Sequence, residues 1–307
     1  DINRFDSSQF NSNNLHLIEV DFLDIESLNK IPKNIDVAYY LIHSMSTSSK
    51  NFEILELNCA KNFKTYASRT NLKQVIYLSG IVNDNNLSPH LRSRKKVEHE
   101  LSKGSYFLTT LRAGIIVGSG SASFEIIRDL VEKLPIMLTP KWLNTKSQPI
   151  AIKNVIQFLS RVILFEPSFD KSFDIGGPDI LTYKQMLLVF AEIRGMKRYI
   201  YALPIMTPRL SSYWLYFVTS TSYKLATKLV QSMKTEILCT PNNLRDLLNI
   251  KIYTYKESVE FAFDKIEQKE VLSSWTDALS GDKLKKGVNK LMILPTYGCL
   301  TDVRKQK

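Results

Sequence analysis

The sequence predicts an α/β protein built on a doubly wound parallel sheet. Two apolar runs, residues 74–80 and 107–117, flank a polar, highly charged stretch that has a helical pattern. Neither run alternates apolar with polar residues, which is typical of strands buried on both faces. Strand, helix and strand in this order form a crossover whose two strands are parallel neighbours. Because ligands of such sheets bind beyond the carboxyl ends of the strands, we expect Ser79 and Gly114 to border a site.

The part of the chain before these runs continues the same alternation. Residues 1–14 are polar and predict a loop, and residues 15–20 predict a strand. A short helix is expected to end at Ile31, and Asp24 and Ser27 are its candidate capping residues.

A second buried strand is predicted for residues 37–42, which are mostly apolar. Apolar side chains then recur at steps of three or four from Phe52 to Tyr66, which predicts an amphipathic helix. Val97 and Leu101 mark the narrow apolar face of the helix between the two central strands. The resulting order of strands and helices is that of an α/β sheet.

The second half of the sequence predicts a mainly helical region that forms a smaller domain or lid on the sheet. Helices are expected at residues 124–134, 155–163, 182–193 and 254–266, and short strands at 150–152 and 173–175. Thr182 with Gln185, and Thr254 with Glu257, have the spacing of capping boxes.

Residues 203–218 are rich in aromatic side chains, including Tyr213, Trp214, Tyr216 and Phe217. Such a stretch suits an apolar substrate pocket or a helix on a membrane surface. It suits equally well the packing of the lid against the sheet, because aromatic residues dominate protein cores.

The composition is that of a globular protein with a basic balance. Of the 307 residues 44% are hydrophobic, and the formal net charge is +11. A basic balance favours an anionic partner such as a nucleotide, but we find no nucleic-acid motif and expect no such partner. The three cysteines have neither metal-ligand nor disulfide spacing, which favours a reducing, cytoplasmic location and no metal site. No apolar run reaches the roughly 18 residues that suggest a membrane span.

A glycine-rich turn of the form G-x-x-G-x-x-G is absent from the sequence. In dinucleotide-binding sheets this turn follows the first strand and holds the pyrophosphate at a helix N-terminus. We therefore expect the chain to lack its first strand and helix, and to be cut short at its other end as well.

Several segments between Glu19 and Trp214 together carry the pattern of a known family, among them DVAYYLIHSM, VIYLSGI, LSPHLRSRKKVEHEL, LRAGIIVGSGSASF and FDIGGPDILTYKQM. The sequence resembles the atypical short-chain dehydrogenase/reductases of the NmrA-like kind. It is most similar to a bacterial NAD(P)-binding oxidoreductase subgroup with an extra C-terminal domain of unknown function. The resemblance implies a partial, Rossmann-like dinucleotide-binding domain at residues 1–122, a substrate or lid region at 123–270, and the start of the extra domain at 271–307.

The resemblance also implies a set of cofactor-binding residues along the carboxyl ends of the strands. The adenine ring would lie against Asp21 and Phe22, and the nicotinamide amide against the residues from Ala113 to Ile116. The set is Asp21, Phe22, Ile42, His43, Ser44, Ser79, Gly80, Ala113, Gly114, Ile115 and Ile116. From the residues alone, Asp21 can also simply cap the turn after its strand.

Three residues fall at the catalytic positions of the family. Ser79 matches its catalytic serine, although a serine at a strand end also satisfies backbone groups. His90 and Arg94 stand where active members have Tyr-x-x-x-Lys. Histidine transfers protons near neutral pH, whereas arginine holds ribose hydroxyls but is no base. The alternative is that His90 starts a helix and Arg94 is a surface charge.

Three functional hypotheses follow. The first is an oxidoreductase that uses NADP or NAD, with NADP favoured by the basic balance, and acts on a small carbonyl or apolar substrate. The second is a non-catalytic dinucleotide-binding sensor or assembly subunit, as the replaced Tyr-Lys pair suggests. The third is a lipid- or quinone-handling protein at a membrane surface. Neither the substrate nor the oligomeric state follows from the sequence.

Overall fold

The structure is a computed structural model that describes residues 14–43, 52–82, 89–203, 233 and 235–267. The predicted loop before residue 14, the aromatic stretch after residue 203 and the segment 271–307 therefore lie outside the described residues.

A parallel sheet of four strands is the centre of the molecule, in the order β1-β2-β3-β8. Its strands are β1 (Val37–Tyr40), β2 (Gln74–Gly80), β3 (Phe107–Ala113) and β8 (Lys171–Ile175). All three pairings are parallel, and the register places Gly80 opposite Ala113 and Ala113 opposite Ile175. The predicted α/β class and the central crossover are thereby confirmed.

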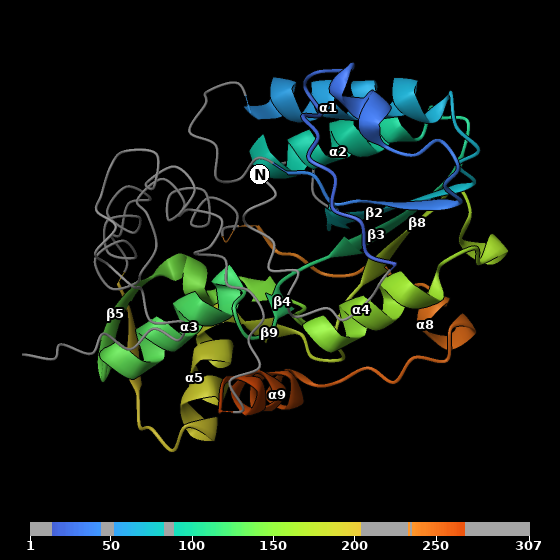
Figure 1. Ribbon diagram of the computed structural model, residues 1–307. Coiled ribbons are helices and arrows are strands. Elements are labelled where there is room, and N and C mark those ends of the chain that lie inside the picture. The colour runs from blue at the N-terminus through green and yellow to red at the C-terminus, as the bar shows by residue number, and fades with distance from the viewer. Residues whose placement is uncertain (1–13, 44–51, 83–88, 204–232, 234, 268–307) are drawn as a thin grey trace, which may run out of the picture.

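Helices cover both faces of this sheet, as Figure 1 shows. On one face lie α1 (Phe52–Ala67) and α2 (Pro89–Leu101), and on the other lie α4 (Ile152–Arg161) and the short α8 (Leu244–Leu247). The strands are apolar on both faces because each face meets a helix layer. Val75 and Tyr77 belong to the core under α1 and α2, whereas Ile76 belongs to the core under α4.

A second core lies beside the sheet. It is formed by α3 (Ala122–Lys133), α5 (Tyr183–Ile193) and α9 (Tyr255–Glu267), which meet around the rings of Phe124, Phe190 and Phe263. Both predicted capping boxes are present: Thr182 exchanges hydrogen bonds with Gln185, and Thr254 with Glu257. The helical prediction for this half is confirmed.

Among the described residues, three short strand pairs lie outside the main sheet. The remaining strands are β4 (Ile116–Val117) with β7 (Ile150–Ala151), β5 (Ile136–Pro140) with β10 (Tyr199–Leu203), and β6 (Lys146–Ser147) with β9 (Leu181–Thr182). The 3₁₀ turns are η3 (Ser27–Lys30), η4 (Lys141–Asn144) and η5 (Glu166–Ser168). The pair β5–β10 was not predicted, because its partners lie about sixty residues apart in sequence.

Three sequence predictions need correction. Residues 15–20 are not a strand, because they form no ladder with another described segment. The run 107–117 is broken at residues 114–115, since β4 leaves the main sheet to pair with β7. The helix expected before Ile31 is a single 3₁₀ turn, and Ser27 accepts a hydrogen bond from the Asp21 N–H instead of capping it.

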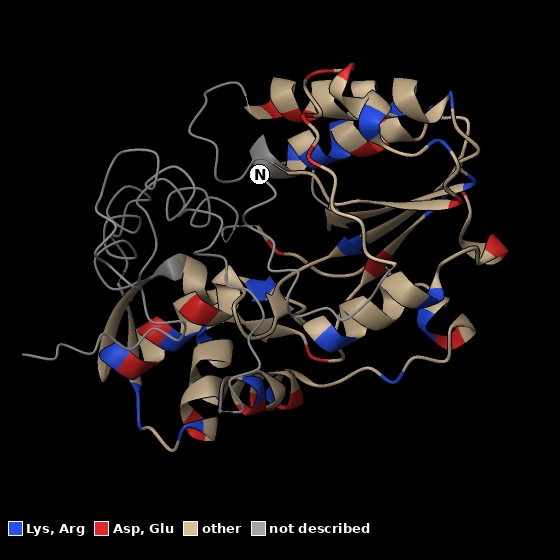
Figure 2. Ribbon diagram, viewed as in Figure 1, with Lys and Arg blue, Asp and Glu red and all other residues tan. Residues whose placement is uncertain are grey.

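Basic and acidic residues are not segregated to different parts of the described structure. Figure 2 shows basic and acidic residues mixed along the helices on both faces of the sheet. Among the described residues, no helix is long and apolar enough to cross a membrane. The same part of the chain contains no group of three or more metal-ligating side chains.

Candidate functional site

The candidate site is the edge of the main sheet at which its four parallel strands end. Ser79 lies opposite Arg112 at this edge, and Gly80 lies opposite Ala113. Ile42 and His43 follow the end of β1, the strand next to β2. The predicted residues of three different strands are therefore brought to one edge, as the parallel topology requires.

Ser79 is the predicted residue with the most unusual environment. Its side chain is buried, at 4% exposure, and its hydroxyl makes no hydrogen bond of acceptable geometry with any described residue. Burial raises the pKa of the neighbouring Tyr77, while the charge of Arg94 and then a side-chain interaction with Ser79 act to lower it, so the Tyr77 and Ser79 hydroxyls lie near each other without a well-aligned hydrogen bond. Buried hydroxyls without a partner are uncommon, so this one needs an explanation.

Helix α2 brings Arg94 to the same strand end. Its guanidinium Nη1 donates a hydrogen bond to the Leu78 carbonyl at 3.2 Å, and the Tyr77 hydroxyl donates to the Arg94 carbonyl at 3.5 Å. A Cβ atom on Gly80 would lie 2.8 Å from Leu91 Cδ2, so helix and strand approach closely here and the Leu91 side chain would have to shift to admit a larger residue. Arg94 is partly buried and bound to the strand backbone, so the alternative that it is only a surface charge does not describe it.

His90 belongs to the first turn of α2, four residues before Arg94, as predicted. The position of its side chain lies outside what the structure describes. Its proposed role in proton transfer therefore stays a prediction.

The residues after β3 are engaged in packing. A Cβ atom on Gly114 would lie 3.1 Å from the Gln148 carbonyl, which explains a glycine here without any ligand. The Ile115 carbonyl accepts a hydrogen bond from the Ile150 N–H at 2.8 Å, and Ile116 pairs with Ile150 in the β4–β7 ladder. Their implied contact with nicotinamide stays a prediction.

The predicted adenine-side residues lie over α1. Asp21 is exposed, and its Oδ1 accepts a hydrogen bond from the Leu23 N–H at 2.9 Å, so it does cap its own turn. The Phe22 ring stacks on Phe63 with 6.3 Å between centroids. A cofactor role for Asp21 would be additional to this turn.

Two further residues of the predicted set follow β1. Ile42 packs against the core under α1 and α2, and His43 is exposed with its Nδ1 3.1 Å from the Leu41 carbonyl oxygen. Ser44 lies outside the described residues. Their roles as cofactor ligands stay predictions.

Sequence reasoning missed an ion network directly behind this edge. Arg112 forms two hydrogen bonds with Glu98 of α2, from Nε at 3.1 Å and from Nη2 at 2.5 Å. Asp174 of β8 lies 4.0 Å away from Arg112 Nη1. Burial acts to lower the pKa of Arg112, but the hydrogen bonds and charges of Glu98 and Asp174 outweigh it and raise the pKa. The sequence did contain a signal for this network: Arg112 stands within the apolar run of β3, and a buried arginine needs an acidic partner.

Comparisons with solved structures identify the fold. The structure superposes on the NADP(H) complex of Citrobacter sp. triphenylmethane reductase with a TM-score of 0.62 at 14% identity, covering 79% of this chain and 81% of that one. A nucleoside-diphosphate-sugar epimerase from Staphylococcus aureus matches with a TM-score of 0.61 at 13% identity, covering 78% and 82%. The NADPH complex of Escherichia coli NADPH-dependent quinone oxidoreductase QOR2 matches with a TM-score of 0.60 at 16% identity, covering 80% and 83%.

These likenesses confirm, at the level of the fold, the resemblance read from the sequence. The three structural neighbours are an epimerase, a reductase in complex with NADP(H) and a quinone oxidoreductase in complex with NADPH, and what they share with this chain is the α/β fold with a parallel sheet. No protein-family model and no curated protein sequence matches the chain.

Proposed function

We propose that this protein is an NAD(P)-binding oxidoreductase that acts on a small carbonyl or apolar substrate at the carboxyl edge of the main sheet. The observation that carries the proposal is the buried Ser79 hydroxyl, which has no partner among the described residues and lies at that edge. Two of the structural neighbours named above support the same assignment, since one is a reductase in complex with NADP(H) and the other is an NADPH-dependent quinone oxidoreductase.

The residues present fit one part of a dinucleotide better than the rest. Ser79, Gly80 and Arg94 converge at one strand end, which suits the nicotinamide and its ribose. Asp21 is exposed in the turn that lies over α1, and its carboxylate suits a hydrogen bond with an adenosine hydroxyl. The described residues leave the pyrophosphate site unassigned, because a glycine-rich turn is not among the 307 residues of the sequence.

A bound nicotinamide would supply hydride transfer, which no side chain provides. In this chain the Ser79 hydroxyl would donate a hydrogen bond to a substrate carbonyl oxygen and so stabilise the charge that develops there. Arg94, held by the Leu78 carbonyl, would fix the orientation of the ribose or the substrate. His90 is the candidate for moving a proton, because a histidine changes charge near neutral pH.

A second candidate is favoured by the hydrogen bond from Arg94 to Leu78. In the family pattern the lysine at this position lowers the pKa of a tyrosine, and an arginine engaged with the strand backbone supplies no such pair. A dinucleotide-binding sensor or assembly subunit without turnover would keep the binding edge and need no proton donor.

Titration of the 307-residue chain with NADPH and NADH, followed by the fluorescence of the reduced nicotinamide, tests the proposal. We expect saturable binding that Ser79→Ala leaves largely unchanged, because the Ser79 hydroxyl is assigned to the substrate carbonyl oxygen, whereas substrate turnover should fall in this variant. The matched control is Tyr106→Phe, which also removes a buried hydroxyl without a partner among the described residues, but before the start of β3 and so at the opposite end of the sheet.

The outcomes separate the two candidates. Oxidation of NADPH by a panel of aldehydes, ketones and quinones, lost in Ser79→Ala, supports the oxidoreductase. Saturable binding without turnover of any of them supports the sensor or subunit. Absence of binding by either nucleotide, in a chain that melts cooperatively, rejects both.

A further inference from the structure

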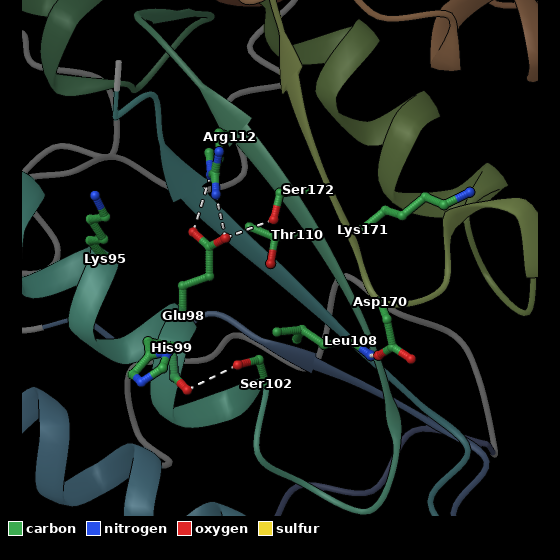
Figure 3. A pocket seen from close by; sticks show the side chains of 10 residues that line it. All are labelled: Lys95, Glu98, His99, Ser102, Leu108, Thr110, Arg112, Asp170, Lys171 and Ser172. Atoms are coloured by element: carbon green, nitrogen blue, oxygen red, sulfur yellow. Dashed lines mark hydrogen bonds and ion pairs between the residues drawn. The ribbon is translucent and has the colours of Figure 1, made fainter. Parts of the chain in front are cut away.

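A pocket of about 330 Å³ lies between the later turns of α2 and the strands β3 and β8, and it extends from Arg112, beside the candidate site, to Leu108 near the start of β3 (Figure 3). Leu108, Thr110 and Arg112, alternate residues of β3, form its floor, and Glu98 of α2 reaches over them. Lys95 stands at the rim, whereas the side chain of Lys171 extends away from the other labelled residues. The pocket thus faces the side of the sheet that α2 covers.

The acidic groups around this pocket already have partners. The two oxygens of Glu98 accept hydrogen bonds from Arg112, and one of them accepts a third from the Ser172 hydroxyl at 2.7 Å. Asp170 accepts from the Leu108 N–H at 3.0 Å, and Asp174 accepts from the Thr240 N–H at 2.9 Å. The carboxylate oxygens around the pocket therefore already accept hydrogen bonds from the protein.

Several donors of the lining remain without a partner in the described chain. Thr110 is fully buried, at 0% exposure, and its hydroxyl makes no hydrogen bond there. Arg112 Nη1 has only Asp174 Oδ1 as a polar neighbour, at 4.0 Å, which is beyond hydrogen-bond range. Lys95 is exposed and forms no ion pair with any described residue. A ligand that satisfies Thr110 and Arg112 Nη1 must supply acceptor atoms, and a negative charge on this ligand would be attracted by Lys95.

We propose that this pocket binds a short-chain organic acid through its carboxylate. The carboxylate oxygens would accept from the Thr110 hydroxyl and from Lys95 or Arg112, and the carbon chain would lie against Leu108. The volume corresponds to about eleven water molecules at about 30 Å³ each, so a short-chain acid fits and leaves room for water or for a longer carbon chain. Both halves of such a ligand thus meet the matching chemistry, hydrogen-bond donors and an apolar wall.

A ligand-observed NMR titration of the whole chain with butyrate tests the proposal, with inorganic phosphate as the competing oxyanion. We expect saturable binding of butyrate, and about tenfold weaker binding in Thr110→Val, which removes one hydrogen bond to a charged group while keeping the side-chain shape. Lys95→Ala weakens the binding as well and, as an exposed change, does not threaten folding.

The matched control is Lys96→Ala, the next residue of α2, whose ammonium group pairs with Glu53 at 3.2 Å and does not line the pocket. Unchanged binding in this control, with loss in the other two variants, supports the site. No saturable binding of butyrate, equal binding in Thr110→Val, or binding of phosphate in preference to butyrate overturns the proposal. Because no nucleotide is used, the result is independent of the proposed function.

Discussion

Replacement of Glu98 by glutamine should destabilise the fold far more than the loss of an ordinary surface charge. The Glu98 carboxylate accepts three hydrogen bonds, two from Arg112 and one from Ser172. The Arg112 side chain is only 28% exposed and that of Glu98 only 12%. In Glu98→Gln an amide N–H₂ faces guanidinium donors, and Arg112 keeps only Asp174 at 4.0 Å as a charged neighbour.

The size of the effect follows from burial. Removing one partner of a fully buried ion pair costs about 3–5 kcal/mol. Because Arg112 retains some contact with water and the glutamine still accepts one hydrogen bond, we expect a decrease of about 2–3 kcal/mol in the free energy of unfolding. Glu98 links α2 to β3 and β8, so the loss should appear in the cooperative transition of the whole sheet.

The matched control is Asp36→Asn. Asp36 pairs with Lys73 at 2.8 Å, but the two side chains are 67% and 62% exposed. Water and salt screen such a pair, and its loss should change the free energy of unfolding by less than about 1 kcal/mol. Urea unfolding followed by circular dichroism at neutral pH measures both variants. If Glu98→Gln proves no more destabilising than Asp36→Asn, the buried network contributes nothing and the reasoning is wrong.

Three further outcomes follow from other parts of the fold. Gln74→Leu should lower the free energy of unfolding by about 2–4 kcal/mol in the same urea assay, because this fully buried side chain makes three hydrogen bonds to β3 and to the chain after α4. Thr182→Ala should cost about 1 kcal/mol by removing the cap of α5 and should leave the slope of the urea transition unchanged. Burial raises the pKa of Cys59 from 9.0 to about 11 and that of Cys239 to about 12, so both thiols should react with iodoacetamide at pH 8 only after unfolding. Since the unfolded thiols ionise first, stability should fall as pH rises from about 9 toward 11, and a flat profile would contradict the raised pKa values.

The strand ends could be read from the sequence because they depend on local patterns. The apolar runs of β2 and β3, with the charged helix between them, place Ser79 and Gly80 at the carboxyl edge whatever the rest of the chain does. The same logic identified the caps Thr182 and Thr254, whose partners lie three residues away. Such features can be predicted from the sequence because the residues that cause them are close neighbours in the chain.

Contacts between distant segments could not be read in this way. The hydrogen bonds from Arg112 to Glu98, and from the Arg94 side chain to Leu78, depend on how α2 is rotated on the sheet. The pairing of β5 with β10 depends on the packing of the helices between them. Side-chain partners of this kind have no spacing rule in the sequence.

By itself the sequence determined the class of the fold, the parallel direction of the central strands and the edge at which we propose that a nucleotide binds, because hydrophobic periodicity and the handedness of the crossover act locally. Only the tertiary structure decided that Ser79 is buried without a hydrogen-bond partner among the described residues, that Asp21 caps its own turn, and that Thr110 and Arg112 line a pocket. Burial and hydrogen bonding of a side chain are set by whichever distant residues pack against it, and this choice is made when the whole chain folds.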